Sequence, residues 1–265
     1  MANIDLKEIE TFPSRFGKWD KDKIKKENEK LNAKIIEYQK QMYAQGEYSL
    51  LVVMQGMDAS GKWWAVRKTF MGINPAGAQV TSFKVPSKEE RAHDFLWRIH
   101  KKAPKRGMIS VFDRSHYEDL LVPYVEDFLS EKQIAERAEH INNFEKMMED
   151  NKTIVLKFYL HVSHEEQKRR LHERLTNPLK YWKHEDGDFR KSSKYEKFID
   201  AYHWVFEHTD TKTAPRHIIQ SDNNHVKVNQ ISQVIVKAFE EEMKLEWPDL
   251  ETDFTLVEVP GLMEE

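Results

Sequence analysis

The sequence contains no cysteine among its 265 residues. Disulfide bridges, thiol catalysis and cysteine-ligated metals are therefore excluded. Glycine and proline are also scarce, at nine residues each, and no Ser/Gly-rich linker, internal repeat or low-complexity segment divides the chain. We therefore expect a single domain over residues 1–265.

Long hydrophobic runs are absent as well. The longest purely aliphatic run covers residues 50–54 and is far too short to cross a bilayer. The first residues contain no apolar stretch of the kind that secretory signals require. The sequence thus predicts a soluble, cytoplasmic protein that has no membrane partner.

Neither sign of charge dominates the chain. Its 42 basic and 45 acidic residues nearly cancel, giving a net charge of −3. We therefore expect no nucleic-acid partner, and any polyanion site must be a local concentration of Lys and Arg. Such a concentration lies between residues 62 and 106, and it is either a solvated face or a polyanion track. Its members are Arg67, Lys68, Lys84, Lys88, Arg91, Arg98, Lys101, Lys102, Lys105 and Arg106.

Short apolar runs alternate with helical stretches along the chain. Residues 21–45 carry apolar side chains at helical spacing, which predicts a long helix within an N-terminal helical extension over about residues 1–46. Serines with Glu or Gln three residues later, at 87, 130 and 163, predict helix starts. Strands are predicted at 50–54, 80–83, 108–112, 154–156 with 158–160, and 217–219. This alternation predicts a parallel sheet covered by helices on both faces.

A phosphate-binding loop is predicted directly after the first of these strands. Residues 56–62 match the pattern G-x-x-x-x-G-K, and a helical stretch follows them. The glycines let successive backbone N–H groups turn toward a phosphate, and the helix N-terminus adds a favourable field. Lys62 would place a positive charge on the transferred phosphoryl group. The alternative is a plain strand–turn–helix connection in which the two glycines only make the bend.

The hydroxyl side chain that usually follows the lysine of such a loop is missing. Trp63 and Trp64 stand in its place, and an indole cannot coordinate a metal. A metal ion would therefore need carboxylate ligands, and Asp58 inside the loop is one candidate.

A second candidate ligand is Asp113, which ends the apolar run 109–112. In parallel sheets, ligands bind at the edge where the strands end. Asp113 opposite Asp58 would suit Mg²⁺, which prefers oxygen ligands and retains part of its hydration. Arg114 follows as a bidentate phosphate donor. The alternative role for Asp113 is the N-cap of a helix over residues 115–121.

A further basic region predicts a lid over about residues 163–195. Lys168, Arg169, Arg170 and Arg174 fall on a predicted helix that ends at Asn177. The polar stretch beyond it adds Lys180, Lys183, Arg190, Lys191 and Lys194. Small kinases close an Arg-bearing lid over the phosphates and so exclude water. The alternative is a basic helix exposed to solvent.

Five motifs together resemble the polyphosphate kinase 2 family, in the same order and with natural spacing between about residues 50 and 239. They occupy residues 56–62, 72–75, 80–84, 93–98 and 112–119. The Ser-His-Tyr-Glu-Asp sequence at 115–119 resembles the third class of the family, whose members phosphorylate nucleoside mono- and diphosphates with polyphosphate.

This resemblance implies a thymidylate-kinase-like fold, a three-layer α/β/α P-loop kinase domain with a parallel sheet and a helical lid. It also implies reversible phosphoryl transfer between inorganic polyphosphate and AMP or ADP, with ATP among the nucleotides bound. The implied cofactor is Mg²⁺, for which Mn²⁺ substitutes, and the implied assembly is a homodimer or homotetramer.

The same resemblance implies roles for individual residues. The metal would be held by Asp58 and Asp113. The catalytic groups would be Asp58, Lys62, Asp113, Arg114 and Arg174. Phosphate and nucleotide would be bound by Gly56, Met57, Ala59, Ser60, Gly61, Asn74 and Lys84. The polyphosphate path would be lined by Arg67, Lys68 and Tyr117.

Two other functions stay open on the sequence. An ATP-dependent kinase of a nucleotide or small metabolite would share the fold and the loop but would need no long basic track. The second alternative is a catalytically impaired protein that binds a polyanion or a nucleotide. It follows from Trp63 and Trp64, which stand where the family usually has Asp-Gly or another small pair.

Overall fold

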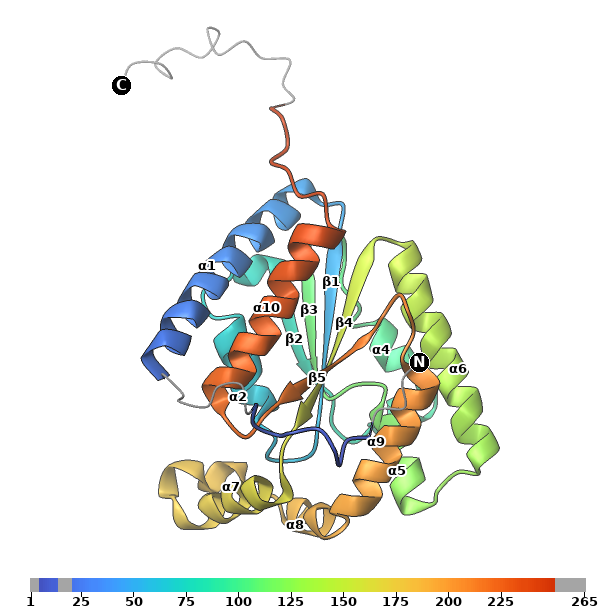
Figure 1. The fold of residues 1–265 in the computed structure, drawn as a ribbon. Coiled ribbons are helices and arrows are strands. Elements are labelled where there is room, and N and C mark those ends of the chain that lie inside the picture. The colour runs from blue at the N-terminus through green and yellow to red at the C-terminus, as the bar shows by residue number, and fades with distance from the viewer. Residues whose placement is uncertain (1–4, 14–20, 251–265) are drawn as a thin grey trace, which may run out of the picture.

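A five-stranded parallel sheet forms the centre of the computed structural model, which describes residues 5–13 and 21–250 (Figure 1). Neighbouring strands follow the order β2-β3-β1-β4-β5, and every pair is parallel. The strands are β1 (Ser49–Gln55), β2 (Ala78–Ser82), β3 (Ile109–Asp113), β4 (Thr153–His161) and β5 (Arg216–Gln220). All five lie where the apolar runs predict strands, and the two runs at 154–156 and 158–160 form the single strand β4.

Helices connect these strands and cover the sheet. They are α1 (Lys21–Gln45), α2 (Lys62–Thr69), α3 (Lys88–Arg91), α4 (Trp97–His100), α5 (Glu118–Glu126), α6 (Glu131–Asp150), α7 (His164–Thr176), α8 (Asp186–Ser193), α9 (Tyr195–Thr209) and α10 (Asn224–Glu242), with the 3₁₀ segments η2 (Pro75–Gly77) and η3 (Pro178–Lys183). The serines at 87, 130 and 163 cap α3, α6 and α7 as predicted. Ser163 lacks the reciprocal bond of a capping box, because the side chain of Glu166 turns to Arg169 and Arg170 instead.

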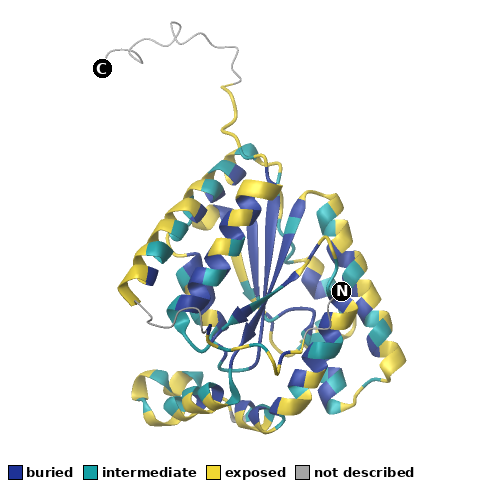
Figure 2. Cartoon of the chain, viewed as in Figure 1, coloured by how far each residue is buried: buried dark blue, intermediate teal, exposed yellow. Residues whose placement is uncertain are grey.

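Two hydrophobic cores lie on opposite faces of the sheet, because successive side chains of a strand point in opposite directions. Leu50, Val52 and Met54 of the central strand β1 pack into one core with α1, α2 and α10. Leu51 and Val53 pack into the other core with α5, α6 and α9. Figure 2 shows the central strands β3, β1 and β4 as almost completely buried, whereas the edge strand β2 is largely exposed or intermediate. This arrangement confirms the predicted three-layer α/β/α fold.

The segment predicted to be a lid forms α7, η3 and α8, which lie beyond one end of the sheet (Figure 1). Across the described residues, every helix is too short or too polar to span a bilayer. The predicted single domain and its N-terminal extension also take in residues 1–4, 14–20 and 251–265, which lie outside the described residues.

Candidate active site

The loop after β1 has the backbone of a phosphate-binding loop. Gly56, Ala59 and Gly61 have φ values of 137°, 64° and 91°. A side chain at Gly56 would also meet the carbonyl oxygen of Leu160, since a Cβ atom there would lie 2.9 Å from it. The helix α2 then begins at Lys62 with no side-chain cap, so the N–H groups of its first turn have no partner from a capping residue. An anion at this helix end would satisfy them.

Lys62 lies across the inside of this loop. Its Nζ atom donates to the carbonyl oxygens of Gly56 at 2.6 Å and Met57 at 3.2 Å. Burial lowers the pKa of Lys62, whereas the nearby charge of Asp58 raises it. The ammonium group is thus held at the loop by the backbone, beside a carboxylate that favours its charged form.

Asp58 sits between two cations from different parts of the chain. Its Oδ1 atom accepts from Arg114 Nη2 at 2.6 Å, and its Oδ2 atom accepts from Lys191 Nζ of α8 at 3.1 Å. Burial alone would raise the pKa of Asp58, but the charges of Lys62, Arg114 and Lys191 outweigh it and lower the pKa. Asp58 is therefore an ionised carboxylate that joins the phosphate loop to the segment following β3 and to α8.

Asp113 reaches the same edge of the sheet, because its position in β3 pairs with Met54 of β1, two residues before the loop. It is not a helix N-cap: α5 begins at Glu118, and Tyr117 occupies the cap position without a side-chain bond. Within the described residues, the Asp113 side chain makes no hydrogen bond or ion pair. Arg114 has a φ of 64°, and this left-handed backbone follows the end of β3. The structure thus rules out the alternative role of Asp113.

The carboxylates available here suit a hydrated hard cation. Within residues 5–13 and 21–250, no group of three His, Asp or Glu side chains converges to form a closed metal site. Mg²⁺ does not need one, since it binds through one or two carboxylates, waters and substrate phosphates. Asp113 fits this role with its uncommitted oxygens, whereas both oxygens of Asp58 contact cations in this structure.

A pocket opens between the phosphate loop, α5, α7, α8 and α9. It is lined by Gly56, Met57, Asp58, Arg114, Glu118, Val122, Gln167, Lys191, Phe198 and Tyr202. Burial raises the pKa of Glu118, while the charges of Arg114 and Lys62 oppose the rise. The pocket therefore has charged groups at the loop and an apolar wall on α9, as a ligand with a charged end and a flat apolar end requires.

Arg174 does not contact the phosphate loop directly. Its guanidinium pairs with Asp188 of α8, and Nη1 also donates to the Lys183 carbonyl oxygen at 3.1 Å. Burial raises the pKa of Asp188, and the negative charge of Asp58 raises it further. The side chain of Asp188 therefore lies between Arg174 and Asp58. Both Arg174 and Asp188 belong to the segment predicted to be the lid.

Tyr117 is not where the resemblance implies. The prediction that it lines the polyphosphate path is contradicted, because its side chain is fully buried. Its hydroxyl donates to Glu145 Oε1 at 2.6 Å in the core beneath the sheet. The preceding Ser115 and His116 are buried as well, so the whole turn after Arg114 packs inward.

The residues predicted to contact the nucleotide and to form the basic track do not gather at one place in the structure. The Asn74 side chain accepts from Ala76 N and caps η2, and Lys84 is exposed. Arg98 is buried and pairs with Asp119 and Glu90, so it cannot serve in a polyanion track. Part of the basic region is therefore structural.

The two tryptophans have different surroundings. Trp63 is 52% exposed. Trp64 is half-buried, and its ring lies 4.9 Å from the Arg67 guanidinium and 5.5 Å from Lys68 Nζ. Both predicted polyphosphate-path cations on α2 thus contact an aromatic ring.

Several residues at the site were not singled out from the sequence. Arg170 of α7 and Lys227 of α10 bind carbonyl oxygens of the loop, and Gln167 Nε2 donates to the Asp58 carbonyl oxygen at 3.0 Å. Arg170 and Lys191 appeared only as members of a basic region. The available signal for Arg170 was its helical spacing from Glu166 and Arg174, which places all three on one face of α7. The signal for Lys227 was a lysine among apolar residues near the start of the last helix.

A parallel α/β/α sandwich with a glycine-bent phosphate loop, an inward lysine and a strand-end aspartate defines a P-loop phosphotransferase. The family model for Polyphosphate kinase 2 matches residues 18–246. The chain belongs to the polyphosphate kinase 2 family.

Relatives and solved structures agree with this membership. The chain is 39% identical over 222 residues to the AMP/ADP-polyphosphate phosphotransferase of Meiothermus ruber, covering 84% of this chain and 83% of that one. It is 33% identical to the ADP-polyphosphate phosphotransferase of Rhodopseudomonas palustris over 82% of this chain and 78% of that one. The crystal structure of polyphosphate kinase 2 from Arthrobacter aurescens superposes with a TM-score of 0.91 at 32% identity, covering 97% of this chain and 91% of that chain.

Proposed function

We propose that this protein transfers phosphoryl groups between inorganic polyphosphate and AMP or ADP. The observation that carries the proposal is the cluster in which Asp58 lies between Arg114 and Lys191, next to Lys62 in the phosphate loop. The relatives that bear polyphosphate:AMP or polyphosphate:ADP activity in their names support the choice of donor and acceptors.

In the forward reaction, a terminal phosphate oxygen of the nucleotide attacks the terminal phosphorus of polyphosphate. The bond from that phosphorus to the bridging oxygen breaks, and the shortened polyphosphate leaves with the electron pair. Negative charge is spread over the transferring group, so catalysis rests on positioning and on fixed positive charge. Lys62 and Arg114 supply that charge, and the N–H groups at the start of α2 bind the phosphate oxygens.

The proposal includes Mg²⁺, with Mn²⁺ as a substitute. Asp113 and Asp58 would hold the ion, which would neutralise phosphate charge when bound. Both oxygens of Asp58 accept from Arg114 and Lys191, so Asp113 would be the main ligand, and Asp58 would contribute an oxygen where one of these cations binds phosphate instead.

The segment α7–η3–α8 would act as the lid. Lys191 and Asp188 of α8 already lie next to Asp58, and Arg174 is tied to Asp188. Closure over bound phosphates would bring Arg174 to the transferring group and keep water from hydrolysing the donor. A homodimer or homotetramer in the cytoplasm completes the proposal, as family membership implies.

The test is a donor and acceptor assay. The protein is incubated with AMP or ADP and either polyphosphate or another nucleoside triphosphate as the sole phosphoryl donor, and the products are identified. Formation of ADP and ATP from polyphosphate is expected. Turnover with the nucleoside triphosphate alone would favour an ordinary nucleotide kinase, and tight binding without turnover would favour the impaired protein.

The metal is tested in the same assay. Excess EDTA should abolish turnover, and added Mg²⁺ or Mn²⁺ should restore it, because the site offers hard oxygen ligands. Undiminished turnover in excess chelator would remove the metal from the proposal.

A further inference from the structure

We propose that Arg170 and Lys227 are positioning residues, which fix the outer side of the phosphate loop so that its inner side can bind a polyphosphate chain. This inference rests on the proposed function and deepens it. Neither residue lines the pocket at the loop. Both bind the loop from outside through backbone carbonyl oxygens, and both lie more than 100 positions away in the sequence.

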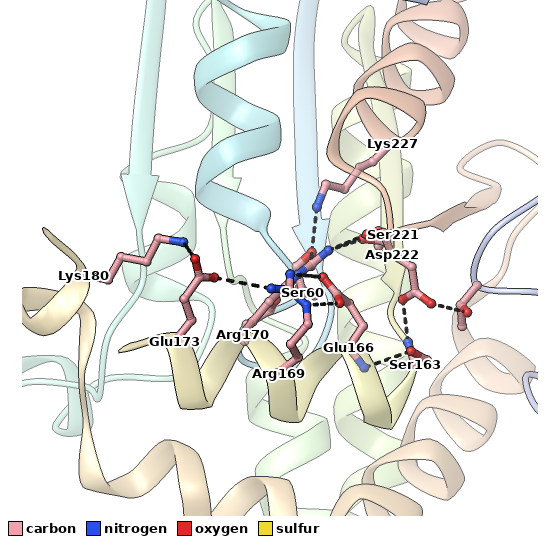
Figure 3. Close-up of polar contacts among 12 residues, drawn as sticks. Ser60, Ser163, Glu166, Arg169, Arg170, Glu173, Lys180, Ser221, Asp222 and Lys227 are labelled. Atoms are coloured by element: carbon pink, nitrogen blue, oxygen red, sulfur yellow. Dashed lines mark hydrogen bonds and ion pairs between the residues drawn. The ribbon is translucent and has the colours of Figure 1, made fainter. Parts of the chain in front are cut away.

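Arg170 uses all five of its N–H donors (Figure 3). Its Nη1 atom donates to the carbonyl oxygens of Ala59 and Ser60, both at 3.0 Å. Its Nη2 atom donates to the carbonyl oxygens of Ser221 and Asp222 at 2.8 and 2.9 Å. Its Nε atom donates to Glu166 Oε1 at 2.7 Å. The planar guanidinium therefore joins the phosphate loop to the β5–α10 turn, which a lysine with its compact ammonium cannot do.

Lys227 converges on the same carbonyl. Its Nζ atom donates to Ser60 O at 2.8 Å, and its side chain is completely buried. The ammonium group lies so close to Gly61 that any side chain at that position would collide with it. Burial lowers the pKa of Lys227, and the charge of Arg170 lowers it further. Among the described residues no carboxylate pairs with Lys227, and a buried amine without a counter-charge costs stability, so a functional reason for keeping it is expected.

The geometry of the peptide unit explains what these contacts achieve. The C=O and N–H of a trans peptide point in opposite directions. When the Ser60 carbonyl faces outward to Arg170 and Lys227, the N–H of Gly61 faces the inside of the loop. The left-handed backbone of Gly61, with a φ of 91°, keeps this peptide turned that way as α2 begins.

The same contacts tie the loop to the lid. Asp222, whose carbonyl binds Arg170, also accepts from Ser163 N at 2.9 Å, at the start of α7. Glu166 and Arg170 both belong to α7, whose C-terminal end carries Arg174. Arg170 therefore sets the position of the loop relative to α7, the first helix of the lid segment.

The test compares neighbouring arginines. Arg170→Lys keeps the charge but loses the five-donor fork, and Arg170→Met loses both. Arg169→Met is the matched control: within the described residues, the 61% exposed side chain of Arg169 pairs with Glu166 and Glu173 of its own helix, and its loss leaves the bond from Arg170 Nε to Glu166 in place. Lys227→Met removes the second cation while keeping a similar volume. The measurements are KM for polyphosphate, KM for ADP, kcat and the thermal midpoint Tm.

Both Arg170 variants should raise KM for polyphosphate by about tenfold or more, since small misplacements of binding groups cost up to about a hundredfold. KM for ADP should stay within about twofold, and Arg169→Met should match the parent protein throughout. Lys227→Met should raise KM for polyphosphate while its Tm is unchanged or higher. Arg170→Lys combined with Lys227→Met should lose less than the product of the two single effects, because both act on one carbonyl.

Three results would overturn the proposal. The first is a KM for polyphosphate within about twofold of the parent in Arg170→Lys and Lys227→Met. The second is an equal rise in the KM values of polyphosphate and ADP. The third is a fall in kcat that is fully explained by a smaller fraction of folded protein. If Arg170→Met does not fold, Lys227→Met still decides the matter. Failure of the proposed function would look different, because the parent protein would then show no polyphosphate-dependent turnover.

Discussion

Two carboxylates in this protein each accept a hydrogen bond from a cation, yet their surroundings differ. Asp58 at the phosphate loop contacts Arg114 and Lys191, and it lines a pocket. Glu145 of α6 accepts from Tyr117 at 2.6 Å and from Lys157 at 2.7 Å, and it is 1% exposed in the core.

The elements that supply the partners account for the difference. Lys157 lies in the middle of β4 and also donates to the Thr209 carbonyl oxygen at 2.7 Å, so the cation of the Glu145 cluster is held by a buried strand of the sheet. Of the partners of Asp58, Arg114 comes from the turn after β3, and Lys191 comes from α8, a helix of the proposed lid. Similar ion pairs therefore lie in two settings: the pair at Glu145 is buried in the core, and the pair at Asp58 lines a pocket next to the proposed lid.

The largest expected effect is the loss of the Glu145 carboxylate. Glu145→Ala leaves Lys157 buried without its partner and should cost about 3–5 kcal/mol of unfolding free energy, measured by urea denaturation. Asp58→Asn should cost clearly less stability but most of the activity. Equal losses of stability in the two variants would remove the distinction between the clusters.

Loss of the charges at the loop should act on turnover instead. Lys62→Ala and Asp113→Ala should each lower the polyphosphate-dependent rate by about a hundredfold or more, since one preorganised contact to a transferring group contributes on the order of 3 kcal/mol. Initial rates at saturating ADP would measure this. Lys146→Ala, which removes an exposed lysine of α6, is the control. Near-normal rates in either well-folded loop variant would refute the assigned site.

The Glu145 cluster also predicts a response to acid. Burial alone would raise the pKa of Glu145, but Lys157 and the bond from His116 lower it to about 2. The unfolded chain takes up this proton near pH 4.3, so the stabilisation is complete above that pH and is lost as pH falls toward 2. Unfolding free energies between about pH 5 and pH 2 should therefore fall less steeply in Glu145→Gln than in the parent protein. Parallel curves would contradict the assigned pKa.

The smallest effect is expected at the two tryptophans. Trp63→Asp with Trp64→Gly removes bulk next to the loop and frees Arg67 and Lys68 from the Trp64 ring. We expect the polyphosphate-dependent rate to rise, while the new glycine costs roughly 1 kcal/mol of helix stability. Steady-state rates and thermal unfolding would measure both. Lower turnover or weaker nucleotide binding would mean that the tryptophans serve the site.

The sequence alone determined the order of helices and strands, because apolar spacing and serine caps act between near neighbours. The start and end of α1 and the place of all five strands followed from it. The phosphate loop was equally predictable, since its glycines and lysine form one short pattern next to a buried strand. The position of Asp113 followed from its place at the end of an apolar run.

Tertiary structure decided which polar residues meet. Tyr117 looked available for substrate within its motif, but Glu145, 28 positions later in the chain, draws it into the core. Arg170 and Lys227 bind loop carbonyls across separations of 110 and 167 positions. These cations bind backbone carbonyl oxygens. Every residue type has a backbone carbonyl, so no pattern of side chains in the sequence identifies the partner. Only the packing of α7 and α10 around the end of β1 brings these cations to the loop.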